Sequence, residues 1–151
     1  MPKEQLSPDT ALTVRRTFQA PREKVFRAWT DAKALAEWFH PSAEYTTKVP
    51  ELEFRVGGKY KLEMHHKGGN VHAVGGTYRE IKPPEKLAFT WRWELDPASQ
   101  ESLVTVEFFD RGSSTEILLT HAQLPEGDQR EKHAHGWNGC LEQLAGFIQA
   151  R

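Results

Sequence analysis

The chain has 151 residues, and its 20 Lys and Arg and 21 Asp and Glu leave a formal net charge of -1 at pH 7. This length fits one domain with a core large enough to hold a pocket. The balanced charge lacks the basic surface that binding to nucleic acid or to an anionic membrane requires. We therefore expect a soluble protein with no nucleic-acid partner and no membrane association.

The single cysteine and the N-terminal residues indicate the cellular compartment in which the protein is expected. Cys140 has no second cysteine with which to form an internal disulfide, and no CxxC pair suggests a zinc or redox motif. Residues 1–10, MPKEQLSPDT, have neither the apolar centre of a signal peptide nor the length of a membrane span. We expect a cytoplasmic protein with a flexible segment over 1–10 and a single domain over 11–151.

The first predicted element is a strand over 12–18, LTVRRTF. Apolar residues alternate with polar ones there, which is the period of a strand with one buried face. Arg16 is in phase with the buried set. Its side chain either snorkels at the edge of the core or supplies an inward polar group to a pocket, and the sequence leaves both open.

Two short helices are predicted next, in APREKVFRAWTDAKALAEWF. Pro21 suits a first helical position, Asp31 can cap the second helix, and Pro41 ends it. Apolar residues fall on one face of each helix: Val25, Phe26 and Trp29 in the first, and Leu35 and Trp38 in the second.

Residues 44–122 read as strands and turns. Five stretches with strand character are separated by glycine or proline signals such as HKGGN, KPPEK, LDPASQ and DRGSS. No connection is long enough for the crossover helix of a parallel sheet, so the pattern predicts antiparallel hairpins. Trp91 and Trp93 share one face of their strand with Phe89.

The last segment predicts one long amphipathic helix, which begins at Asp128 in a D-x-x-E pattern. Residues of a helix turn by about 100° each, so His133 and His135 point about 200° apart and cannot ligate one ion. His133 shares the apolar face with Trp137, and His135 is expected in solvent. We expect no metal site.

Three residues are candidates for chemistry. His121 is in phase with Ile117 and Leu119, and it is either a satisfied core histidine or an inward pocket group. His133 is either packed at an edge or in contact with a ligand. Cys140 reads as a small hydrophobe unless a nearby base activates it. The chain contains no GxSxG, HExxH, P-loop or GxGxxG motif, and no cofactor is expected.

Several stretches together resemble the START-like SRPBCC superfamily, in particular the bacterial group similar to the C-terminal domain of the activator of the heat shock protein 90 ATPase. They are RTFQAPREKVFRAWTDAKALAEWF, RVGGKY, GTYREIKPPEKLAFTW, LVTVEFFDRGSSTEILLTH and HGWNGCLEQLAGFI. They occur in the family's order and run from about Leu12 to Ile148.

The resemblance implies an α+β helix-grip fold, in which an antiparallel sheet wraps a long C-terminal helix around a largely apolar cavity. It implies that the cavity is bounded by inward-facing residues chosen by periodicity: Trp29, Trp38, Phe39, Tyr60, Tyr78, Trp91, His121, His133, Trp137 and Cys140. Arg16 is the further polar candidate.

Three functions stay open at this point, because a fold does not imply a function. The first is binding of a small hydrophobic ligand, such as a lipid or an aromatic or polyketide-like molecule, by a monomer or homodimer. The second is a cyclase or dehydratase that uses His121 or His133 as a general acid or base. The third is stimulation of a heat shock ATPase. We expect the third least, since such activators carry a separate N-terminal domain for which 151 residues leave no room.

Overall fold

The structure is a computed structural model that describes residues 11–96, 100–123 and 128–149. The expectation of a flexible segment over 1–10 concerns residues outside this description.

A single seven-stranded antiparallel sheet forms most of the molecule, with strand order β1-β7-β6-β5-β4-β3-β2. Its strands are β1 (Leu12–Phe18), β2 (Tyr45–Leu52), β3 (Lys59–His66), β4 (Val71–Lys82), β5 (Lys86–Trp93), β6 (Ser102–Asp110) and β7 (Thr115–Ala122). The helices are α1 (Arg22–Arg27), α2 (Ala32–Trp38) and α3 (Asp128–Gln149). The predicted element order and antiparallel hairpins are confirmed, but the described part of residues 44–122 holds six strands, since β2 was not among the five predicted stretches.

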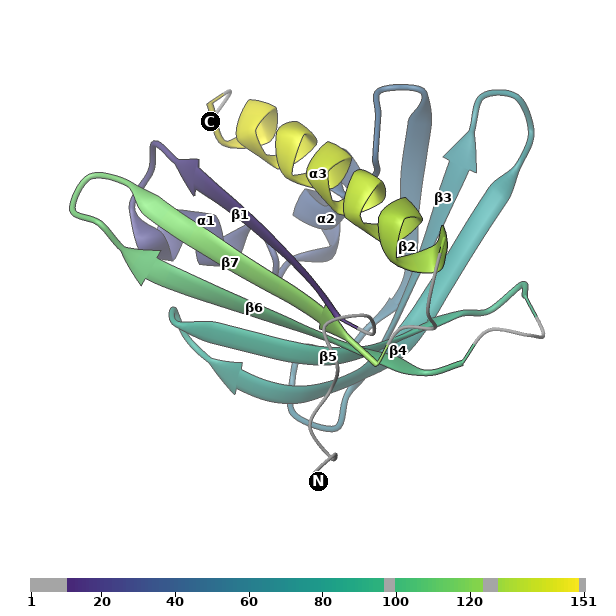
Figure 1. The fold of residues 1–151 in the computed structure, drawn as a ribbon, viewed down its shortest axis with the longest axis horizontal. Coiled ribbons are helices and arrows are strands. Elements are labelled where there is room, and N and C mark those ends of the chain that lie inside the picture. Colours follow the sequence, from purple (N-terminus) through teal and green to yellow (C-terminus); the bar gives the residue numbers. More distant parts are fainter. Residues whose placement is uncertain (1–10, 97–99, 124–127, 150–151) are drawn as a thin grey trace.

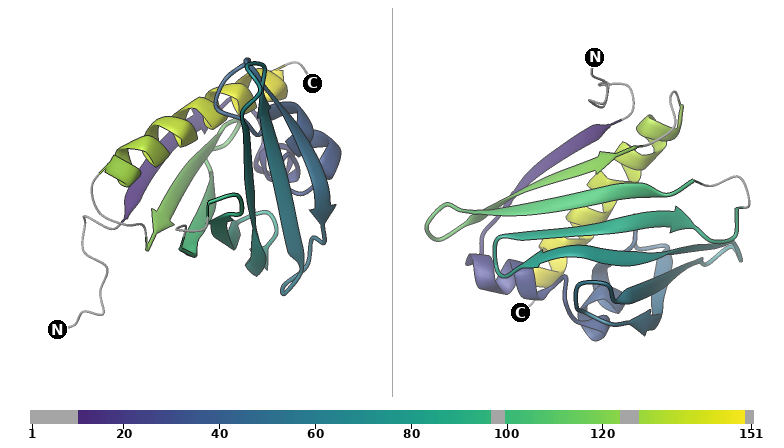
Figure 2. Two further views of the ribbon diagram at one scale, coloured as in Figure 1. Left: turned by 90° about the vertical axis from the view of Figure 1, so that its right-hand side faces the viewer. Right: turned by 90° about the horizontal axis from the view of Figure 1, so that it is seen from below.

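The sheet curves around α3, which crosses its open side diagonally (Figure 1). Seen from below, the strands lie in front and α3 runs behind them (Figure 2). The short helices α1 and α2 connect β1 to β2, the two edge strands, and lie toward the C-terminal end of α3. This is the helix-grip fold that the resemblance implies.

The two short helices differ slightly from the prediction. α1 begins at Arg22, and Pro21 is the extended residue just before it, with φ -67° and ψ 155°. Asp31 does precede α2, but its side chain makes no capping hydrogen bond. These helices are held mainly by burial of their apolar faces, since Val25 and Trp38 are fully buried.

Alternation along the strands places the core between sheet and helix. In β7, Ile117, Leu119 and His121 have no exposed surface, and the residues between them are half-buried. From the helix side, Leu141 and Leu144 are also fully buried. The predicted inward faces of β7 and α3 are therefore confirmed.

Aromatic rings fill the end of the grip near α1 and α2. The ring centroids of Trp29 and Trp38 lie 4.8 Å apart, and those of Phe26 and Phe108 lie 5.1 Å apart. Trp38 donates its indole N–H to the carbonyl of Ala28 at 2.9 Å. We call this region, with Tyr60, Tyr78 and Phe89 beside it, the packed end.

The two tyrosines of the packed end are sealed by neighbouring rings. Tyr60 and Tyr78 have centroids 5.6 Å apart, and each lies against Phe89. The Tyr60 hydroxyl donates to the carbonyl of Thr90 at 2.5 Å. Burial raises the pKa of both phenols above their ordinary value, so both stay neutral.

One glycine brings α3 against the segment that follows α2. A Cβ placed at Gly139 would collide with the carbonyl oxygen of Pro41, whereas Gly136 and Gly146 have open space at that position. Gly139 therefore permits a close approach that any larger residue would prevent.

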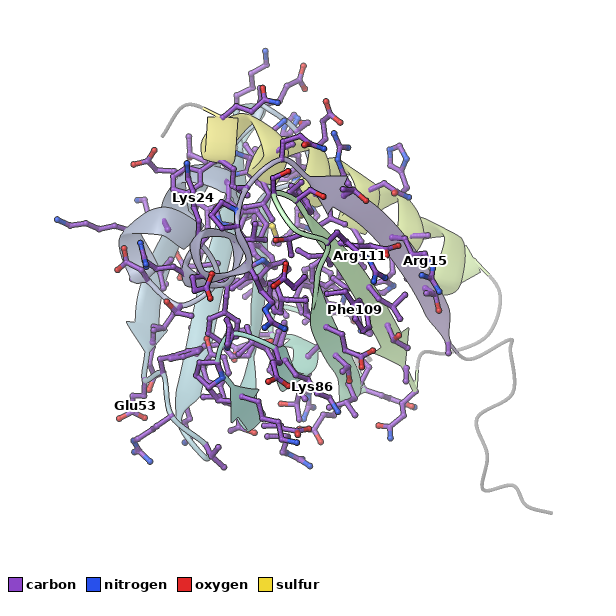
Figure 3. All side chains as sticks on the ribbon, turned by 90° about the vertical axis from the view of Figure 1, so that its left-hand side faces the viewer. Arg15, Lys24, Glu53, Lys86, Phe109 and Arg111 are labelled. Atoms are coloured by element: carbon purple, nitrogen blue, oxygen red, sulfur yellow. The ribbon has the colours of Figure 1, made fainter. Side chains whose placement is uncertain are left out.

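Charged residues cover the outer side of the sheet. Glu116 is paired with Arg15 at 3.3 Å and with Arg111 at 2.7 Å, and the Arg111 guanidinium lies 5.3 Å from the ring of Phe109. Figure 3 shows both arginines and Phe109 on this side of the molecule. Among the described residues, no helix combines the length and the apolar character that a membrane crossing needs.

Candidate ligand pocket

A cavity of about 810 Å³ opens at the other end of the grip, between the first half of the described α3 and strands β2 to β5. Its inner wall is made of Phe39, Met64, Trp91, Trp137 and Cys140, all buried. The volume is within the range of about 300–1,000 Å³ that is typical of small-molecule sites.

Three rings form most of the inner wall. Phe39 lies 5.6 Å from Trp137 and 6.1 Å from Trp91, and the two indoles are 5.0 Å apart. Phe39 follows α2, Trp91 comes from β5 and Trp137 from α3. The wall therefore depends on three segments that only the tertiary fold brings together.

Nearer the solvent, the pocket has a continuous series of rings that we call the ring belt: His66, Tyr45, His72, Trp93 and His133. Their consecutive centroid distances are 4.8, 6.1, 6.3 and 5.9 Å. All five are half-buried or exposed. The belt runs from β2 across β3, β4 and β5 to α3.

A buried hydrogen-bond relay lies behind the inner wall. Trp137 donates its indole N–H to Nδ1 of His121 at 2.9 Å, and Nε2 of His121 lies 2.7 Å from the Ser102 hydroxyl. Ser102 donates to the carbonyl of Trp91 at 3.1 Å. Because Nδ1 accepts and the Ser102 proton is used, His121 must be neutral with its proton on Nε2.

The burial of His121 agrees with this protonation state. Desolvation, with a smaller contribution from the charge of His133, lowers the pKa of His121 to about 3. Both of its ring nitrogens are engaged within the protein. His121 is therefore a satisfied core histidine, and it has no lone pair or proton left for a ligand.

His133 connects the helix to the sheet at the belt. Its Nε2 accepts the indole N–H of Trp93 at 3.1 Å, and its ring lies 4.9 Å from that of His121. His133 is half-buried and lines the pocket, whereas His135 is exposed at the pocket's edge. The exposure of His135 agrees with the prediction, but His135 also lines the pocket, so the two histidines are not separated as fully as the helical geometry predicts.

Cys140 lines the pocket as an unreactive thiol. Burial raises its pKa well above the ordinary value, so the nucleophilic thiolate is not formed at neutral pH. Among the described residues, no group of three or more His, Cys, Asp or Glu is arranged to hold a metal ion.

Five of the eleven candidates from the sequence line the cavity: Phe39, Trp91, His133, Trp137 and Cys140. The other six lie elsewhere. Trp29, Trp38, Tyr60 and Tyr78 fill the packed end, and His121 lies in the relay. Arg16 is paired with Glu142 of α3 at 2.6 Å and is partly exposed, so its side chain snorkels at the edge of the core.

Sequence reasoning missed most of the ring belt. His66, His72 and Tyr45 lie outside the residues that periodicity selected for the cavity. The register could have linked them, since Tyr45 pairs with His66 and Met64 with His72 in neighbouring strands. Trp93 is the exception, because its position two residues after Trp91 predicts that both lie on the same face of the strand.

Fold and site together define an α+β helix-grip protein with a ring-lined pocket at one end. The chain belongs to the family described as Activator of Hsp90 ATPase homolog 1-like protein, whose model matches residues 19–149.

Similar proteins support this assignment. The chain is 31% identical to a protein from Chromobacterium violaceum of known structure, covering 94% of this chain and 98% of that one, with a TM-score of 0.85. It is 27% identical to the AHSA1 protein from Silicibacter pomeroyi, covering 93% and 98%, with a TM-score of 0.80. It is 25% identical over 130 residues to activator of 90 kDa heat shock protein ATPase homolog 1 from Mus musculus, covering 86% of this chain but only 34% of that protein. The chain thus spans about a third of that curated relative.

Proposed function

We propose that this protein binds a small hydrophobic or aromatic molecule in the pocket. The observation that carries the proposal is the 810 Å³ cavity whose inner wall is formed by Phe39, Trp91 and Trp137. Concave sites of this size, apolar inside and polar at the edge, are the usual form of a small-molecule site. Aromatic walls favour aromatic ligands through stacking and edge contacts.

The histidines support binding more than catalysis. A general acid or base must reach the ligand with a nitrogen of its own. His121 uses both nitrogens internally, and Nε2 of His133 accepts from Trp93. A cyclase or dehydratase mechanism therefore has no support from His121, and Nε2 of His133 is already in use as an acceptor.

The five tryptophans provide the test. In a ¹⁵N-labelled sample, the indole signals of Trp91, Trp93 and Trp137 report on the pocket, and those of Trp29 and Trp38 report on the packed end. Titration with 2-naphthalenemethanol or 2-naphthoate should shift the first three and leave the other two nearly unchanged. If neither probe at millimolar concentration shifts the pocket indoles, the proposal fails.

Two glycines of α3 offer a matched pair of variants. Gly136 lines the pocket and Gly146 is exposed on the same helix, and a Cβ meets nothing within 4 Å at either position. Gly136→Leu should occupy the pocket entrance and weaken probe binding at least tenfold. Gly146→Leu makes the same change in helix propensity and should bind like the wild type. Equal binding by both variants would place the probe outside the pocket.

Stimulation of a heat shock ATPase is a second candidate, favoured by the family and by the curated relative that is such an activator. The test is the steady-state ATPase rate of an Hsp90-type chaperone with and without this protein. A rate increase that Gly136→Leu retains would separate this activity from ligand binding. No change in rate and no binding to the chaperone would exclude it.

A further inference from the structure

The polar groups around the pocket divide into those with partners and those without. Glu44 accepts from His66 at 3.2 Å and lies 3.7 Å from the Lys67 ammonium. Nδ1 of His66 in turn accepts the backbone N–H of Gly68 at 3.0 Å, so its proton is on the nitrogen that faces Glu44. Asp96, the other carboxylate of the lining, has an interaction of its own. Neither carboxylate is therefore without a partner.

The polar side chains left over are all able to donate. The Tyr45 hydroxyl, His72, Lys132 and His135 line the pocket and make no hydrogen bond or ion pair with the residues that the structure describes. Lys132 carries a positive charge, and a neutral imidazole still donates one N–H. The uncommitted side chains at the pocket edge thus include a cation and several donors, but no carboxylate.

The indole groups of the pocket show the same imbalance. Trp137 and Trp93 each donate to a histidine, but the indole N–H of Trp91 is buried without a hydrogen-bond partner among the described atoms. A buried donor without a partner is costly, and it makes its surroundings favourable for negative charge. The nitrogen has almost no exposed surface, so it adds to the positive potential of the wall without reaching a ligand itself.

The inference drawn from these observations rests on the proposed function, and it narrows the chemical class of the ligand. We propose that the pocket binds a planar aromatic anion, with its rings against Phe39, Trp91 and Trp137 and its acid group at the edge beside Lys132 and His135. Charge-assisted hydrogen bonds are about twice as strong as neutral ones, so the acid group adds affinity as well as orientation.

Two probes of the same ring system isolate the charge. 2-Naphthoate is an anion at neutral pH, and 2-naphthalenemethanol is its neutral counterpart. Titrations that follow the pocket indole signals should give a dissociation constant about five- to tenfold lower for the naphthoate, since a tenfold ratio corresponds to about 1.4 kcal/mol. The ratio should shrink as salt is added, because the pocket edge is open to solvent.

Variants that remove the charge of Lys132 and the donor of His135 locate the acid group. Lys132→Gln should weaken naphthoate binding about three- to fivefold and leave the alcohol unchanged, and adding His135→Leu, which removes the donor, should bring the two probes to nearly equal affinity. Lys33→Gln removes an exposed lysine of α2 that does not line the pocket, and it should leave both constants unchanged. Any unfolding or structural change caused by a substitution would appear in the indole signals of Trp29 and Trp38.

The outcomes separate this inference from the proposed function. If neither probe binds, the proposed function fails. If both bind with equal affinity, or if the ratio survives removal of Lys132 and His135, ligand binding stands and the preference for an aromatic anion is overturned. The inference is supported if the difference in affinity between the two probes is lost in the Lys132 and His135 variants and kept in Lys33→Gln.

Discussion

Three tryptophans of the pocket wall differ in what their indole N–H groups meet. Trp93 donates to His133 and Trp137 donates to His121, whereas Trp91 has no partner among the described atoms. The two paired indoles are held in place by hydrogen bonds that cross between the sheet and α3. These pairs fix the ring orientations on which stacking with a ligand depends.

His121 makes the stability of the protein depend on pH. Its pKa is lowered to about 3 in the folded state, whereas in the unfolded chain it is near the ordinary value of 6.5. The unfolded state therefore binds the proton first as the pH falls. The stabilisation by neutral His121 is complete above about pH 6.5 and is lost toward pH 3, by about 1.4 kcal/mol per pH unit in the free energy of unfolding.

Urea unfolding at several pH values between 7 and 5 measures this slope. His121→Gln keeps an acceptor and a donor in the relay but cannot titrate, so its slope should be smaller by about one proton. His135→Gln, which removes an exposed imidazole, serves as the control. The explanation would be refuted by a His121→Gln slope equal to that of the wild type.

At the scale of elements, α3 has two structural roles, and different residues fulfil each of them. Its apolar stripe, with Leu141, Leu144 and Ile148, closes the core, while Lys132 to Cys140 form one side of the pocket. The helix is held close to the segment after α2 because Gly139 has no side chain beside Pro41. The position of α3 thus sets the width of the pocket.

Alanine at the three glycines of α3 should therefore have opposite effects. Gly136→Ala and Gly146→Ala meet no obstacle and should each stabilise the protein by up to about 1 kcal/mol through helix propensity. Gly139→Ala should destabilise it despite the same gain, because Cβ collides with the backbone of Pro41. Chemical denaturation of the three variants measures this. A stabilised Gly139→Ala protein would show that α3 is free to move away at no cost.

At the scale of the whole molecule, the grip has a packed end and an open end. The first is filled by Trp29, Trp38 and their neighbours, and the second holds the cavity. The packed end supplies stability because its rings are buried against one another. The open end keeps apolar surface in contact with solvent, and a bound ligand would cover it.

A matched pair of truncations tests this division. Leu87 is buried away from the pocket, and Met64 is buried in its wall. Leu87→Ala should cost about 2–5 kcal/mol of unfolding free energy and leave naphthalene binding unchanged at a temperature where the protein stays folded. Met64→Ala should change the affinity as well, because it alters the wall. Equal effects on binding would argue against two separate ends.

The sequence by itself determined the element order, the inward faces and the position of His121, because periodicity records which side of a strand or helix is buried. The angle between successive helical residues likewise predicts the difference in burial between His133 and His135 without reference to any tertiary contact. Periodicity does not tell whether an inward residue meets another side chain or empty space. That was decided by the tertiary structure, which filled one end of the grip with Trp29, Trp38, Tyr60 and Tyr78 and brought Tyr45, His66 and His72 to the open end. The ring belt crosses four strands and a helix, and its members become neighbours only through strand register and the docking of α3.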